Sequence, residues 1–289
     1  MNKMILAAGI ATAGLLATGT GVTAALADDT PPLCQTGCAT VFVPPGAGPH
    51  MPFGIAHGPL GSEWFADGPA NTIDRVNQRG AITAYQVPTP GANPGWVTVD
   101  DSGNVWFAER FAGKIGEITP DGTITEFPLP GAFPLPQGIV AAPDGTLYIT
   151  EQAGNAIARL DPVTGHVTVF PVPTPAASPL GLALGSDGAL WFTELSGGKI
   201  GRITTAGALT EYPVSGGPVG ITVGKDGNLY VALFFAHGLD RVNLAGQVTG
   251  HWDLPAGALQ VATGAGLTIW VADTFGGLVY RVTPYLTSQ

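Results

Sequence analysis

Acidic residues recur about every 40 residues in this chain, each at the end of a short aromatic run. The runs have the form "VWFAE" or "LWFTE", and their acids are Asp67, Glu109, Glu151, Glu194 and Asp273. Carboxylates gathered on one face could bind a divalent cation, because hard cations prefer oxygen ligands. The same repeats carry the bases Arg75, Arg159, Arg202, Arg241 and Arg281, with Lys114 and Lys199. We expect these acids and bases to pair across neighbouring strands, and a cation site is the alternative.

Positions that break the repeat are the better candidates for a binding site, because a repeated residue usually serves the repeat. Trp96 stands in an opening where the usual form is x-Gly-Ile, and Gln137 is the only polar residue after an opening proline. Arg110 directly follows Glu109, and Phe234 lies where other repeats have an acid and small residues. Aromatic side chains with a few polar groups are typical of small-molecule and peptide sites. Local repacking of irregular repeats is the alternative.

Two histidines, His50 and His237, are expected in loops on one face, where they could meet; exposed loop histidines are the alternative. The sequence shows no zinc spacing, no nucleotide loop and no Gly-x-Ser-x-Gly, so the residues alone assign no catalytic group and no cofactor. The predicted binding residues are His50, Trp96, Glu109, Arg110, Gln137, Glu151, Glu194, Phe234, His237 and Asp273.

The elements that must position these residues are short β-strands. Each repeat opens with a proline or a small residue, as in "PQGIVAA" and "PLGLALG", and continues through an aromatic run to a segment such as "KIGRI". A turn and a last short segment such as "LTEYP" follow, and Asp-Gly pairs suit the tight turns. Four strands in about 40 residues are typical of a propeller blade. The sequence therefore predicts an all-β, six-bladed β-propeller over residues 39–289, whose incomplete last blade is closed by a strand at residues 39–45.

The N-terminal segment is predicted to direct export. Residues 1–27 combine Lys3, an apolar run and the sequence Ala-Leu-Ala, which is typical of a secretory signal peptide; an uncleaved membrane anchor is the alternative. We expect a secreted protein, with attachment to the cell envelope as the alternative, and no membrane span in the mature chain. Residues 28–38 form an arm in which Cys34 and Cys38 are predicted to form a disulfide. The net charge of −10 and the absence of a basic run argue against a nucleic-acid partner.

The motifs "LWFTELSGGKIGRIT" and "GTITEFPLP" resemble those of the virginiamycin B lyase (streptogramin lyase) family, and the likeness covers nearly all of residues 50–283. The resemblance implies a propeller that opens a cyclic depsipeptide by elimination at an ester. It also implies a base that removes a proton next to a carbonyl and a Mg²⁺ ion held by carboxylates.

The blades that carry the family's site begin with Pro-His-x-Ile, and this chain departs from that pattern. The residues after the opening positions here are Phe53, Gly95, Gln137, Leu180, Val219 and Leu259. In the repeat most similar to the family's last blade, Gly217 stands where a carboxylate is wanted and Val219 where a histidine is wanted. We therefore expect a protein that binds a small molecule, peptide or protein without catalysis. A lyase with relocated residues and Mg²⁺, and a non-catalytic scaffold, are the alternatives.

Overall fold

The computed structural model describes residues 50–254, 257–264, 266–273 and 278–283. The predicted signal peptide, the Cys34–Cys38 disulfide and the closing strand at residues 39–45 lie outside the described residues, and they stay predictions. Within the described part, no helix is long and apolar enough to cross a membrane.

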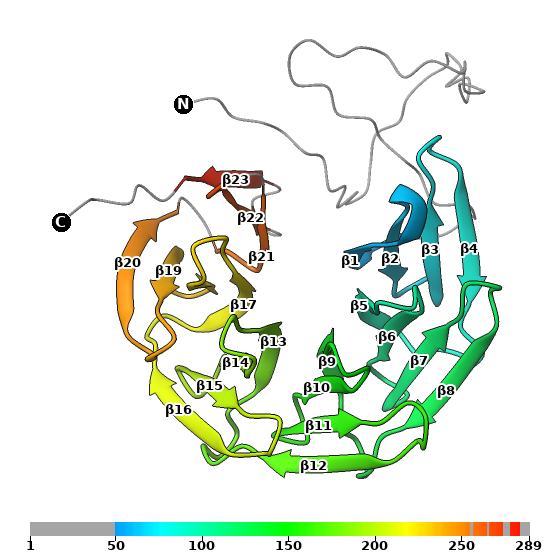
Figure 1. Ribbon diagram of the computed structural model, residues 1–289, viewed down its shortest axis with the longest axis horizontal. Coiled ribbons are helices and arrows are strands. Elements are labelled where there is room, and N and C mark those ends of the chain that lie inside the picture. Colours follow the sequence, from blue (N-terminus) through cyan, green and yellow to red (C-terminus); the bar gives the residue numbers. More distant parts are fainter. Residues whose placement is uncertain (1–49, 255–256, 265, 274–277, 284–289) are drawn as a thin grey trace, which may run out of the picture.

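The described residues form six antiparallel sheets arranged around a central axis, so the predicted six-bladed propeller is confirmed (Figure 1). The innermost strands are β1 (Pro52–His57), β5 (Pro94–Val99), β9 (Pro136–Ala141), β13 (Pro179–Leu184), β17 (Pro218–Val223) and β21 (Gln260–Thr263). The second strands are β2 (Glu63–Asp67), β6 (Val105–Glu109), β10 (Leu147–Glu151), β14 (Leu190–Glu194), β18 (Leu229–Leu233) and β22 (Ile269–Asp273). The third strands are β3 (Thr72–Val76), β7 (Lys114–Ile118), β11 (Ala156–Leu160), β15 (Lys199–Ile203), β19 (Gly238–Val242) and β23 (Leu278–Val282).

The outermost strands are β4 (Ile82–Gln86), β8 (Ile124–Pro128), β12 (Val167–Pro171), β16 (Leu209–Pro213) and β20 (Val248–Asp253). A single turn of 3-10 helix, η1 (Pro59–Gly61), joins β1 to β2. The sixth sheet has three described strands, β21, β22 and β23, and lies next to the fifth, where β17 contacts β21.

The aromatic second strands hold neighbouring blades together. Trp106 of β6 is 1% exposed and belongs to one apolar cluster with Ile139 of the next blade. Trp191 likewise packs with Ile221 of the following blade. Burying an aromatic side chain of this size contributes several kcal/mol, on the order of 25 cal/mol per Å² of apolar area. Each blade interface is therefore a core of its own.

The strand register places the start of each inner strand beside the end of its second strand. Pro94 lies opposite Glu109, Pro136 opposite Glu151, and Pro179 opposite Glu194. The recurring acids therefore lie on the side of the ring where the inner strands begin, which we call the opening face.

Candidate binding site on the opening face

The four recurring acids whose side chains are described are buried separately, one in each of the first four blades. Asp67, Glu109 and Glu194 are 0% exposed and Glu151 is 2% exposed. Burial raises the pKa of Glu109 to about 8, with repulsion from Glu126 as a smaller cause. Burial likewise raises the pKa of Glu151 and of Glu194 to about 7. The side chain of Asp273 lies outside the described residues.

The described acids do not gather into the cation site that was the alternative. Among the described residues, no group of three or more histidine, cysteine or acidic side chains could hold a metal ion. The carboxylate oxygens of both Glu109 and Glu194 are buried without a hydrogen-bond partner. The described carboxylates are therefore isolated from one another, each buried within its own blade.

The predicted pairing of these acids with the recurring arginines is also wrong. Each arginine lies opposite the aromatic residue near the start of the second strand, as Arg202 does opposite Trp191, whereas Glu194 ends that strand. Arg202 bonds to Asp187 at 2.8 Å and lies 5.8 Å from the Trp191 ring centre. The acids and the arginines are thus at opposite ends of the same ladder.

The two lysines lie opposite the acids but bond elsewhere. The Lys114 Nζ atom donates to Glu126 Oε2 at 2.7 Å and to Thr89 Oγ1 at 2.7 Å. The backbone N–H of Thr89, in the joint that leads into the blade, donates to Glu126 Oε1 at 2.9 Å. We call this threonine, lysine and glutamate set the joint clamp. The fourth blade repeats it with Thr174, Lys199 and Glu211.

Four residues on the opening face of the first two blades form an aromatic–arginine cluster: Phe53, Trp96, Arg110 and Phe111. The Phe53 and Trp96 rings meet edge to face with centres 4.9 Å apart. The Arg110 guanidinium lies 5.2 Å from the Phe53 ring centre and 5.8 Å from that of Phe111. Both contacts are within the range of cation–π attraction.

Trp96 completes this cluster because it replaces a glycine. At the equivalent position, a Cβ on Gly54 would come within 2.7 Å of the Trp96 Cα, and a Cβ on Gly138 within 2.5 Å of the Leu180 carbonyl oxygen. Four of the five other blades therefore have glycine where inner strands approach closely, and the sixth has Gln260 at this position. Trp96 instead puts a half-buried ring at this point, between Phe53 and the core of the second and third blades.

Arg110 keeps part of its hydrogen-bonding capacity unused. One terminal nitrogen, Nη1, donates to Asn93 Oδ1 at 3.4 Å, and the Nε atom is buried without a partner. Among the described residues, no acid forms an ion pair with Arg110, whereas Lys114 and Lys199 on the same face each bond a glutamate. Burial lowers the pKa of Arg110, but a guanidinium stays protonated in proteins. The cluster therefore presents a cation framed by aromatic rings.

Gln137 is on the opening face but is 1% exposed. Its Nε2 donates to Gln152 Oε1 at 2.7 Å, and Gln152 Nε2 donates to Ser178 Oγ at 3.0 Å. This polar chain links the third blade to the joint that leads into the fourth. Gln137 is thus a buried residue that holds the third blade to this joint, and it is not exposed to a ligand.

The two candidate histidines have different surroundings. His50 Nδ1 lies 2.5 Å from Asp67 Oδ2, and its side chain is 18% exposed, so His50 is not the exposed loop histidine of the alternative. His237 is exposed, and with a φ of 51° it takes the left-handed turn position of Gly113 and Asn155. In that turn, the rings of Phe234 and Phe235 meet edge to face with centres 5.2 Å apart.

A family model for the virginiamycin B lyase family matches residues 33–278. This chain belongs to the virginiamycin B lyase family. A catalytically inactive histidine-to-alanine variant of virginiamycin B lyase from Staphylococcus aureus, solved with quinupristin, is 35% identical with a TM-score of 0.78 over 80% of each chain. A selenomethionine form of the lyase from Staphylococcus aureus is 33% identical with a TM-score of 0.75, over 82% of this chain and 85% of that one.

A third solved structure is similar to this chain, and one comparison found no match. A streptogramin B lyase structure is 32% identical with a TM-score of 0.75, over 81% of this chain and 83% of that one. No curated protein matches the chain.

The residues that stand at the family's metal position do not fit Mg²⁺. Gly217 has no side chain to bind a metal, and its φ of 70° is a conformation that other residues rarely adopt, so a carboxylate there would strain the backbone and displace the Phe235 ring. Val219, where the family motif wants a histidine, is 5% exposed and carries no donor atom. The side chains at these two positions thus supply no metal ligand.

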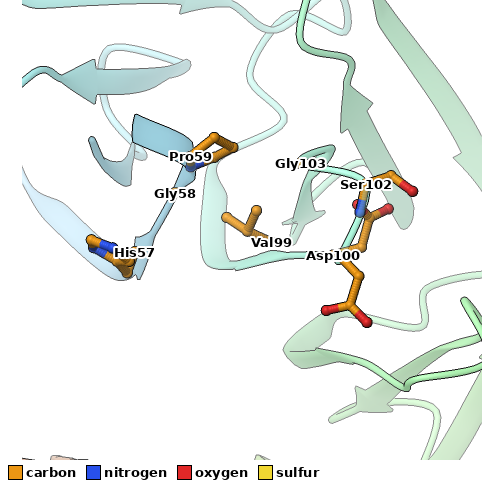
Figure 2. Close-up of a pocket in the computed structure, with 8 residues that line it drawn as sticks. His57, Gly58, Pro59, Val99, Asp100, Ser102 and Gly103 are labelled. Atoms are coloured by element: carbon orange, nitrogen blue, oxygen red, sulfur yellow. The ribbon is translucent and has the colours of Figure 1, made fainter. Parts of the chain in front are cut away.

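The opposite face of this family member has a cavity of about 430 Å³ between the β1–β2 and β5–β6 connections (Figure 2). Two of its polar side chains already have partners within the protein: His57 bonds Glu63 at 2.7 Å, and Asp100 accepts from Trp106 Nε1 at 2.9 Å. These contacts stabilise the two connections. The opening face remains the better candidate.

Two members of the aromatic–arginine cluster, Phe53 and Phe111, are not among the binding residues predicted from the sequence. Phe53 is 42% exposed and Phe111 is 56% exposed, which is unusual for large aromatic side chains beside a buried core. Phe111 directly follows Arg110, which was selected, and Phe53 follows the opening proline of the first blade. The signal available in the sequence was an aromatic residue at an opening or turn position where other repeats have small residues.

Proposed function

We propose that this chain is an exported member of the virginiamycin B lyase family that binds a small molecule or peptide through its opening face without opening a ring. The aromatic–arginine cluster supports this most directly, because two exposed rings flank a cation that lacks an acidic partner in the described part. Such a surface suits a ligand that is apolar or aromatic with one polar or anionic group. A protein ligand that presents the same chemistry would use the same face.

The departures from Pro-His-x-Ile support a role without elimination. The backbone conformation of Gly217 adds a second reason, since a carboxylate residue at its φ of 70° would be strained and would displace the Phe235 ring. Family membership favours the second candidate, a metal-dependent lyase that acts on a cyclic ester. The binding protein would release its ligand unchanged, whereas the lyase would release a ring-opened product.

Calorimetric titration with quinupristin tests the binding role, because a family member was solved with that compound. We expect saturable binding that weakens at least tenfold in Trp96→Ala and in Arg110→Gln. Arg159→Gln is the matched control, because Arg159 also lies over a phenylalanine, Phe170, at 5.9 Å but on the outer strands. Equal binding by all three variants would remove the opening face from the proposal.

Mass spectrometry of quinupristin after incubation with the protein and Mg²⁺ tests the second candidate. We expect the compound to be recovered intact. A linear product with the same molecular formula as quinupristin, formed without addition of water, would establish the lyase reaction and overturn the non-catalytic role.

Export is part of the proposal and is tested separately. Expression of the full chain in a bacterial host should give a protein that begins near Asp28 in the medium or the cell envelope. Recovery of the intact N-terminus from the membrane fraction would support the anchor instead.

A further inference from the structure

The third blade lacks the joint clamp that the second and fourth blades share. The register equates Lys114 with Ala156, because Lys114 lies opposite Glu109 and Ala156 lies opposite Glu151. It also equates Glu126 with Val169, because each lies opposite the third residue of its third strand. In the joint, Gly131 takes the place of Thr89. All three polar groups of the clamp are therefore absent.

A cavity of about 320 Å³ lies where the clamp would be. Two of the replaced positions, Gly131 and Val169, line it, together with the joint prolines and the exposed ring of Phe133. A cavity of this size can hold a small organic ligand. The side chains that line it are apolar apart from that of Glu151.

The carboxyl group of Glu151 lacks the neighbour that the clamp supplies in other blades. Glu151 is 2% exposed, and its Oε1 atom is buried without a hydrogen-bond partner. A Cβ on Gly154 would come within 2.7 Å of Oε2, so the glycine makes room for the carboxyl group beside the cavity. In the second and fourth blades, the lysine ammonium acts on the equivalent carboxyl and favours its charged form. A buried carboxylate without a cation is costly.

We propose that this third-blade cavity binds a primary alkylammonium group, whose charge takes the place of the missing lysine against Glu151 and whose apolar chain lies along Val169 and Phe133. The site is separate from the aromatic–arginine cluster, so this proposal does not depend on the proposed function.

Titration with n-butylammonium tests it, because this ion reproduces the lysine side chain. n-Butanol is the matched neutral probe of similar size and shape. We expect saturable binding of n-butylammonium and at least tenfold weaker binding of n-butanol. NMR chemical shift changes at Gly131, Glu151 and Val169 report the binding. Glu151→Gln should reduce the affinity for n-butylammonium to that for n-butanol.

A grafted clamp gives a sharper test. Ala156→Lys combined with Val169→Glu should rebuild the internal ion pair, fill the cavity and abolish n-butylammonium binding while the protein stays folded. Glu109→Gln and Arg110→Gln are the controls, because they alter the second blade and should leave binding unchanged. Raising the pH from about 6 to about 8 should strengthen binding by about tenfold, because burial raises the pKa of Glu151 to about 7 and the ionised form binds.

Three results would overturn the proposal. The first is equal affinity for n-butylammonium and n-butanol, and the second is no saturable binding of either. The third is unchanged n-butylammonium binding in the folded grafted variant or in Glu151→Gln. The Arg110→Gln control separates these results from any failure of the opening-face site.

Discussion

Individual carboxyl groups in this propeller are held in an unusual protonation state by their position. Glu109 and Glu194 end buried second strands, and each is surrounded by the core of one blade. Burial favours the neutral acid, so these groups gain a proton near neutral pH where an exposed glutamate is ionised. This has a direct consequence for how stability depends on pH.

Glu109→Gln should remove part of the pH dependence of stability. The folded pKa of about 8 lies above the ordinary value of 4.5, so between these limits the folded state holds a proton that the unfolded state has lost. The free energy of unfolding should therefore fall by about 1.4 kcal/mol for each pH unit across this window, and the variant should lose this slope. Urea unfolding at several pH values measures it.

The variant should match the wild type at acid pH and exceed it in stability above pH 8. Glu63→Gln is the control, because Glu63 lies at the opposite end of a second strand with a side chain that is 44% exposed. Parallel pH profiles for Glu109→Gln and the wild type would show that Glu109 is ionised throughout.

Elements in this fold are fastened by contacts that a strand pattern does not reveal. The strands and blades could be predicted well from the sequence, because Gly, Asp or Pro residues separate the strand segments and mark their ends. It placed Glu194 and Arg202 in neighbouring strands but paired them wrongly. Antiparallel register puts the fifth residue of β14 opposite the first of β15, so Arg202, the fourth residue of β15, lies opposite Trp191. Counting along the hairpin would have corrected this.

Other parts of the site could not be found by counting. Lys114 lies opposite Glu109 yet bonds Glu126, because Thr89 from the joint brings a second set of donors to Glu126. The joint lies outside the strand ladders, so residue counting along a hairpin cannot predict which side chains it contacts. The cluster of Phe53 and Arg110 likewise depends on contacts between two blades.

Lys114→Met should loosen the joint before the second blade. The substitution keeps the length of the side chain but leaves Glu126 without its ammonium partner and Thr89 Oγ1 without one of its donors. Since the lysine side chain is 31% exposed and the glutamate 16%, we expect a loss of about 1–2 kcal/mol in the free energy of unfolding. Chemical unfolding measures the loss.

Lys225→Met is the matched control, because Lys225 is exposed in a turn on the opposite face and should change stability by less than about 0.5 kcal/mol. Equal effects of the two substitutions would mean that the joint clamp adds no stability of its own.

The whole molecule depends on how the ring is closed. Five blades have four described strands, and the sixth has three, with β23 as its last described strand. An unpaired strand edge invites association with other chains, so a propeller gains from covering it. We predict that the segment at residues 39–45, which resembles the outer strands in sequence, supplies that cover.

Truncation tests this closure. Removal of residues 1–45 should lower the midpoint of thermal unfolding and cause association that light scattering detects, because β23 would lose its partner and the first and sixth blades their tie. Removal of residues 1–38 is the control, since it deletes Cys34 and Cys38 but keeps the predicted strand, and should leave both measurements close to those of the mature chain. If the longer truncation behaves like the shorter one, the ring is closed without residues 39–45, and contacts between neighbouring blades alone hold it together.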